Sequence, residues 1–134
     1  MYEIDPLTGF TNHRITMVGI EGSTDALEDG LVYARIPLLD LLILVNLDSW
    51  SFYAIGSMTP SQRDLACDEA RQLLYGTDRF SLNLVSRFTG GVSFVGDFYS
   101  TTPSPVVGLI RGLDYDIARD VLVGTDNTHL WRIN

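Results

Sequence analysis

A repeated segment limits the folds open to this chain more than any other feature of its sequence. Residues 63–78 recur in altered form at residues 111–126, and 9 of the 16 paired positions are identical. The offset between the two copies is 48 residues. Repeat proteins stack copies of one structural unit side by side. The sequence therefore predicts that residues 1–134 form a single repeat domain.

Each unit is predicted to be a series of short β segments, because apolar and polar residues alternate between Gly, Asp and Thr turn residues. In the central unit strands are predicted at residues 63–68, 73–77, 81–86 and 92–98, and in the last unit at residues 111–116, 121–125 and 129–134. Weaker copies are predicted at residues 26–28, 31–35, 41–46 and 50–56, preceded by a strand and turn within residues 2–9 and a strand at residues 15–19. The expected fold class is all-β.

A helix pattern competes with this interpretation over residues 61–74. Apolar residues fall there at helical spacing, at Leu65, Ala66, Ala70, Leu73 and Leu74. The counterpart at residues 112–116 is a poor helix former, because it contains Gly and two Asp residues. Two copies of one unit are expected to fold alike, so strands are predicted in both.

Three segments resemble blades of bacterial β-propellers, the broad group that includes the NHL propellers. They are Leu-Tyr-Gly-Thr-Asp at residues 74–78, Tyr-Glu-Ile-Asp-Pro-Leu-Thr-Gly at residues 2–9 and Arg-Gly-Leu-Asp-Tyr-Asp at residues 111–116. The resemblance implies a propeller-like arc of about three four-stranded blades. The repeat units then span approximately residues 1–40, 41–80 and 81–128, and residues 129–134 start or close a further blade.

An arc of three blades is incomplete, since closed propellers have roughly four to eight. Each end of such an arc is expected to expose an apolar sheet face. Completion by oligomerisation would cover these faces. A homodimer is favoured, because two arcs related by a two-fold axis make six blades. Another protein is the alternative partner.

The charge balance argues against two classes of partner. The net charge is −8, and all nine basic residues are arginine. Affinity for nucleic acid and for anionic lipid comes from basic residues, so binding to either is not expected. No apolar run reaches membrane-spanning length, and Glu3 and Asp5 stand where a signal peptide would be positively charged. The chain is therefore expected in the cytoplasm or in an assembled particle.

Two arginines are candidate ligand-binding residues. In the resembling propellers the first strand of each blade lines a central channel, and Arg63 and Arg111 would begin two such strands. Guanidinium groups there could bind carboxylate or phosphate. Alternatively, each arginine pairs with a neighbouring carboxylate, such as Asp64 or Asp78, and fixes its own blade.

Two aspartates occupy equivalent turns after Gly-Thr, namely Asp78 and Asp126. A carboxylate in such a turn can accept backbone hydrogen bonds or coordinate calcium. No known calcium-loop pattern surrounds either residue. His13 and His129 lack partners at ligand spacing, so zinc is not predicted. No cofactor is expected, and calcium remains the alternative.

One turn is apolar, at Ile36, Pro37, Leu38 and Leu39, where the other units have polar residues. These four residues are the predicted contact with a partner or subunit. The sequence shows no catalytic constellation, so an enzyme is not expected. The predicted function is a non-catalytic structural or protein-interaction module of the propeller type. The alternatives are a lectin-like propeller that binds carbohydrate or small anions, and a calcium-dependent six-bladed hydrolase.

Overall fold

The computed structural model describes residues 2–13, 25–28, 30–98 and 109–133. These residues form antiparallel β-sheets and one short 3-10 helix, η1 (Pro37–Leu39), so the predicted all-β class is confirmed. The helix pattern over residues 61–74 is overridden, because β7 and β8 occupy that stretch. No helix in the described part of the chain is long and apolar enough to cross a membrane.

Three sheets follow one another along the chain. The first sheet has the order β3 (Asp25–Glu28), β4 (Leu31–Ile36), β5 (Leu41–Asn46) and β6 (Ser51–Ser57). The second sheet has the order β7 (Asp64–Asp68), β8 (Leu73–Thr77), β9 (Ser81–Val85) and β10 (Val92–Asp97). The third sheet contains β11 (Gly112–Asp116), β12 (Val121–Thr125) and β13 (Leu130–Ile133). Each sheet is an antiparallel meander in which every strand pairs with its neighbour in sequence, as the repeat predicts.

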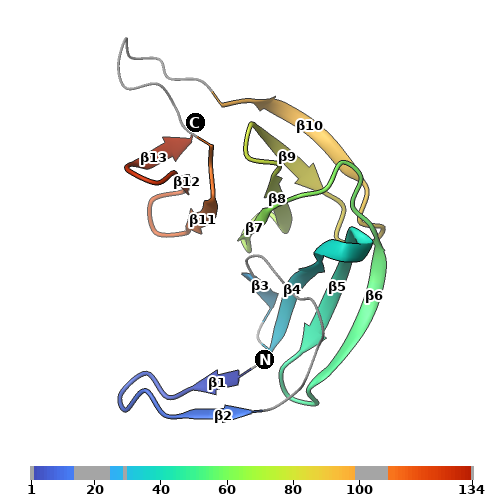
Figure 1. The fold of residues 1–134 in the computed structure, drawn as a ribbon, viewed down its shortest axis with the longest axis vertical. Coiled ribbons are helices and arrows are strands. Elements are labelled where there is room, and N and C mark those ends of the chain that lie inside the picture. The colour runs from blue at the N-terminus through green and yellow to red at the C-terminus, as the bar shows by residue number, and fades with distance from the viewer. Residues whose placement is uncertain (1, 14–24, 29, 99–108, 134) are drawn as a thin grey trace.

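The first strands of the three sheets lie next to one another. β7 contacts β3 on one side and β11 on the other. In Figure 1 the sheets follow an open arc, with these first strands toward its inside and the fourth strands, β6 and β10, along its outside. The order of strands within each sheet therefore runs from the inside of the arc outward.

The N-terminal hairpin forms a separate two-stranded sheet of β1 (Tyr2–Ile4) and β2 (Thr11–His13). The sequence predicted the first strand but not the second. The strand predicted at residues 15–19 lies outside the described residues. β1 and β2 are joined by residues 5–10, a turn whose geometry matters below.

Two apolar cores hold the three sheets together. The core between the first and second sheets includes Tyr33, Leu42, Met58, Leu65, Cys67, Leu74 and Val85. The core between the second and third sheets includes Ala66, Leu82, Leu113 and Leu122, with Tyr75 and Tyr115 packed against it. Neighbouring residues of β7, such as Leu65 and Ala66, belong to different cores because successive strand residues face opposite sides of a sheet. The first three strands of the second sheet, β7 to β9, are thus largely buried on both faces, whereas β10 is mostly exposed.

The two ends of the arc differ from the expectation of exposed apolar faces. On the first sheet, Ala34, Ile43 and Val45 face away from the core shared with the second sheet, yet they are fully buried. On the third sheet, the outer face carries Asp114 and Arg132, which are both exposed. The apolar face predicted for each end is therefore covered at one end, and at the other end it combines charged residues with the exposed Leu130.

The equivalent core positions Leu65 and Leu113 provide a test of the strand register. Leu65 is fully buried and Leu113 is 5% exposed. Replacing either with Ala removes buried methyl groups and leaves a cavity, so each variant should lose about 2–5 kcal/mol of unfolding free energy in urea denaturation. The control Leu38→Ala, at an 85% exposed position, should change it by no more than about 0.5 kcal/mol. Equal effects at Leu38 and Leu65 would contradict the register.

Candidate functional site

The sequence predicted that Arg63 and Arg111 begin two strands, and each lies immediately before one of two adjacent strands, β7 and β11. Both side chains are exposed. Their backbone N–H groups play equivalent parts, since that of Arg63 donates to the carbonyl of Thr77 at 2.5 Å and that of Arg111 to the carbonyl of Thr125 at 2.7 Å. Among the described residues neither guanidinium forms an ion pair. Both positions are therefore accessible to an anion.

The carboxylates considered as partners of these arginines are engaged elsewhere. Asp64 is buried, and its Oδ2 accepts the backbone N–H of Leu113 at 2.5 Å, which links the second sheet to the third. Asp78 Oδ1 accepts the backbone N–H groups of Phe80 and Ser81, both at 2.8 Å. The predicted alternative, an Arg63–Asp pair within one blade, is not formed among the described residues.

Asp78 and Asp126 close equivalent turns. Burial acts to raise the pKa of Asp78, but the N–H groups of Phe80 and Ser81 outweigh it and hold the pKa below its usual value. The backbone N–H of Thr128 has the largest part in holding the pKa of Asp126 well below its usual value. Hydrogen bonds to the ionised form stabilise it in both turns. These bonds fit the structural interpretation of the two aspartates.

Asp126 has a further partner on the neighbouring strand. Its Oδ1 accepts the backbone N–H groups of Thr128 and His129, both at 2.7 Å. Its Oδ2 accepts the indole N–H of Trp131 at 2.9 Å. The rings of His129 and Trp131 lie 5.3 Å apart between centroids. This turn thus holds an aromatic pair at the start of β13.

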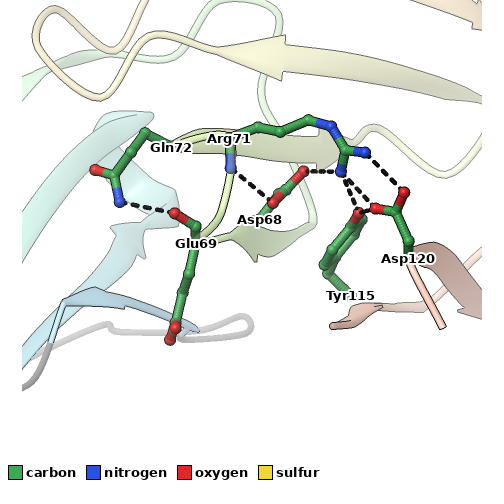
Figure 2. A network of polar contacts seen from close by, with 6 residues as sticks. All are labelled: Asp68, Glu69, Arg71, Gln72, Tyr115 and Asp120. Carbon is green, nitrogen blue, oxygen red and sulfur yellow. Dashed lines mark hydrogen bonds and ion pairs between the residues drawn. The ribbon is translucent and has the colours of Figure 1, made fainter. Parts of the chain in front are cut away.

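A polar network that the sequence analysis did not identify joins the second and third sheets (Figure 2). Arg71, in the β7–β8 turn, donates from Nη1 to Asp68 Oδ2 at 2.8 Å and to the Tyr115 hydroxyl at 2.6 Å. It also binds Asp120 in bidentate fashion, with Nη1 to Oδ1 at 2.5 Å and Nη2 to Oδ2 at 2.7 Å. The Tyr115 hydroxyl donates to Asp120 in turn. One guanidinium therefore bridges two sheets.

The charges of this network support one another. The hydrogen bonds from Arg71 and then from Tyr115 hold the pKa of Asp120 well below its usual value. The hydrogen bond to Asp120 raises the pKa of Tyr115 to about 12. Asp68 is fully buried, and burial acts to raise its pKa, but its bonds to Arg71 outweigh that effect and lower it. The network is ionised and paired near neutral pH.

The second copy of this turn has the same residues but a different environment. Arg119 corresponds to Arg71, and its Nη1 donates to Asp116 Oδ2 at 2.6 Å. Its side chain is 77% exposed and forms no ion pair with a further sheet among the described residues. The Asp–Arg pair within the turn is thus common to both units, whereas in the described part of the chain the bridge to a neighbouring sheet is formed by Arg71 and not by Arg119.

The predicted interface residues are placed as a turn, with one correction. Ile36 belongs to strand β4, where it pairs with Leu41, and is not part of the loop. Pro37, Leu38 and Leu39 form η1. Leu38 is 85% exposed and Leu39 is 65% exposed. Two large apolar side chains therefore project from one turn, as the sequence predicted.

In the described part of the chain, no three His, Cys, Asp or Glu side chains are grouped so that they could hold a metal ion. No family model matches the chain, and no curated protein matches it. Among solved structures, a structural genomics protein of unknown function from Bacteroides thetaiotaomicron is similar at a TM-score of 0.46 and 14% identity. The match covers 85% of this chain and 40% of that one. The chain thus spans less than half of that protein's length.

The Arg71 network predicts a pH dependence of stability. The pKa of Asp120 is lower in the folded chain than in the unfolded chain, where about 3.9 applies. Its contribution to stability is therefore complete above about pH 4 and is lost as the pH falls through the folded pKa. We expect Asp120→Asn to lower the unfolding free energy at pH 6, and the difference from the wild type to shrink toward pH 2.

The measurement is urea denaturation of both proteins at several pH values. Asp97→Asn serves as the control, because Asp97 is an exposed carboxylate on β10. It removes the same charge without touching the network. A difference between wild type and Asp120→Asn that stays constant from pH 6 to pH 2 would contradict the assignment.

Proposed function

We propose that this chain is a non-catalytic structural or protein-interaction module of the propeller type. The observation that carries the proposal is the exposed pair Leu38 and Leu39, which stand on a turn begun by Pro37. Leaving two leucine side chains in water is unfavourable by roughly 1.5–3 kcal/mol for each that a partner could bury. The acidic candidates Asp78 and Asp126, in contrast, are engaged by backbone N–H groups.

The propeller interpretation is supported by the equivalence of the sheets. Four-stranded meanders with adjacent first strands are the arrangement expected of propeller blades, and the first and second sheets have it. Together with the three-stranded third sheet, they make an arc rather than a ring (Figure 1). We propose that a second copy of the chain completes the assembly, with another protein as the alternative partner.

A second candidate function is binding of a small anion or an acidic carbohydrate. It is favoured by Arg63 and Arg111, whose exposed guanidinium groups stand beside adjacent strands. Two such groups could hold one carboxylate or phosphate. Inorganic phosphate, tested by calorimetry against wild type and an Arg63→Ala, Arg111→Ala double variant, distinguishes this function.

The proposed role is tested by titration calorimetry with calcium and by a glycan array. For an interaction module we expect no calcium binding in calorimetry and no glycan binding on the array. Tight calcium binding together with hydrolytic turnover would overturn the proposal in favour of a metal-dependent hydrolase. Specific glycan binding that is lost in the Arg63→Ala, Arg111→Ala variant would favour the second candidate.

The apolar turn gives a specific prediction. A Leu38→Ser, Leu39→Ser double variant should keep the wild-type unfolding free energy to within about 0.5 kcal/mol, because both side chains are exposed. Light scattering of the wild type should give about twice the chain mass of 14.9 kDa, and the double variant should dissociate at higher concentration. The matched control is Phe88→Ser, another exposed apolar residue in a turn. An unchanged dissociation constant in the double variant would exclude this turn from the contact.

A further inference from the structure

The first and second sheets meet at two glycines on the outside of the arc. Gly56, on β6, lies against the turn between β9 and β10, so that a Cβ added to it would lie 2.0 Å from the carbonyl oxygen of Thr89. A Cβ added to Gly90 would lie 2.7 Å from the carbonyl oxygen of Gly56. Real Cβ atoms do not approach so closely, so only glycine fits at this junction.

At this junction the turn at residues 86–91 docks on β6 at Gly56, so β6 is the receiving strand. The second sheet has an equivalent receiving position on β10. Gly96 occupies the place on β10 that Gly56 occupies on β6, since each follows a one-residue bulge and pairs with a leucine of the preceding strand. Nothing lies within 4 Å of a Cβ placed on Gly96. The bulge residue Ile55 packs against the first core, whereas its counterpart Val95 is 49% exposed. In the part of the chain that the structure describes, no turn therefore covers the surface at Val95 and Gly96.

The N-terminal hairpin has a turn equivalent to the docking turn at residues 86–91. Its turn, residues 5–10, has the hydrogen bonds of residues 86–91. In each six-residue turn, the backbone N–H of the first residue donates to the carbonyl of the sixth, at 2.9 Å in residues 5–10 and at 2.8 Å in residues 86–91. The backbone N–H of the fifth residue donates to the carbonyl of the first, at 2.8 Å in both turns. In both, the side-chain oxygen of the first residue accepts the third and fourth N–H groups. Gly9 has φ +70° and Gly90 has φ +74°.

This N-terminal turn is exposed. Leu7 is 94% exposed and Phe10 is 78% exposed. No atom lies within 4 Å of a Cβ placed on Gly9, whereas Gly90 is buried against Gly56. Within the described residues, one docking turn thus has no receiving strand, and one receiving strand has no docking turn.

We propose that β10 at Val95 and Gly96 is the docking surface for the turn at residues 5–10 of a second copy. The proposal deepens the function proposed above and rests on it for the claim that the chain self-associates. The docked hairpin would occupy the third and fourth places of the third sheet, giving the order β11, β12, β1 and β2. In the third place of that sheet, β1 aligns with β13 without a gap. Tyr2, Glu3 and Ile4 would take the positions of Trp131, Arg132 and Ile133.

Such an exchange keeps most of the backbone ladder. Three of the four pairs between β12 and β13 would be replaced by equivalent pairs with β1, and the Thr125–Leu130 pair would be lost. β1 keeps its own pairs with β2. The bond between Trp131 and Asp126 is given up. The gain is a fourth strand and the burial of Val95. Since each copy can donate one hairpin and accept one, a two-fold pair would contain six four-stranded sheets.

The first experiment compares Gly96→Ala with Gly56→Ala. In the single chain the space beside Gly96 is open, so Gly96→Ala should keep the wild-type urea midpoint while weakening self-association at least about tenfold in sedimentation equilibrium. Gly56→Ala should lower the midpoint, because its collision lies within the chain. Ser93→Ala, at an exposed position on the same strand, is the matched control. A monomeric wild type, or an unchanged dissociation constant for Gly96→Ala, would overturn the proposal.

The second experiment identifies the occupant. A photo-reactive benzophenone residue placed at Leu7 should crosslink to residues 92–97 of the other copy, detected by mass spectrometry of mixed ¹⁴N and ¹⁵N chains. Crosslinks confined to one chain, or to another surface, would sink the proposal. Self-association that survives Gly96→Ala but is lost in the Leu38→Ser, Leu39→Ser variant would leave the interaction role standing without this docking surface.

Discussion

Burial of β7, the first strand of the second sheet, on both faces is the constraint on which the rest of the structure depends. Every residue of β7 is buried, including two aspartates, Asp64 and Asp68. A buried carboxylate is strongly unfavourable unless it is hydrogen-bonded or paired. Asp64 meets this requirement through the backbone of the third sheet, and Asp68 through Arg71. The polar contacts between the sheets thus follow from placing the strand between two cores.

The repeat allowed the strands, their order and several roles to be predicted from sequence. Leu65 and Leu113 are buried equivalents, and Asp78 and Asp126 close matching turns. The Arg71 bridge could not be predicted, because Arg71 and Arg119 are identical in sequence and differ only in whether a further sheet lies beside them. The buried pair Gln62 and Asn83, joined at 3.1 Å, could not be predicted for a different reason. The other copy has Ile110 and Trp131 at these positions, so the repeat did not indicate the pair. The repeat in the sequence predicts the features that the units share. Contacts that differ from one unit to another depend on the packing of the folded chain.

The two ends of the arc illustrate the same limit. Leu82 and Leu130 are equivalent positions, yet Leu82 is 9% exposed and Leu130 is 72% exposed. The difference comes from the third sheet, which covers Leu82, while no described sheet covers Leu130. The same face carries the charged residues Asp114 and Arg132, whose equivalents in the second sheet are Ala66 and Leu84. The terminal sheet therefore combines a core position of the repeat with a surface suited to water.

The single cysteine sits in the core between the first and second sheets and is 3% exposed. A thiol so placed reacts with a labelling reagent only when those two sheets separate. The rate of its modification therefore reports how often that one junction opens, independently of the junction between the second and third sheets. The protein carries within its own sequence a probe of how cooperatively its repeated units stay together.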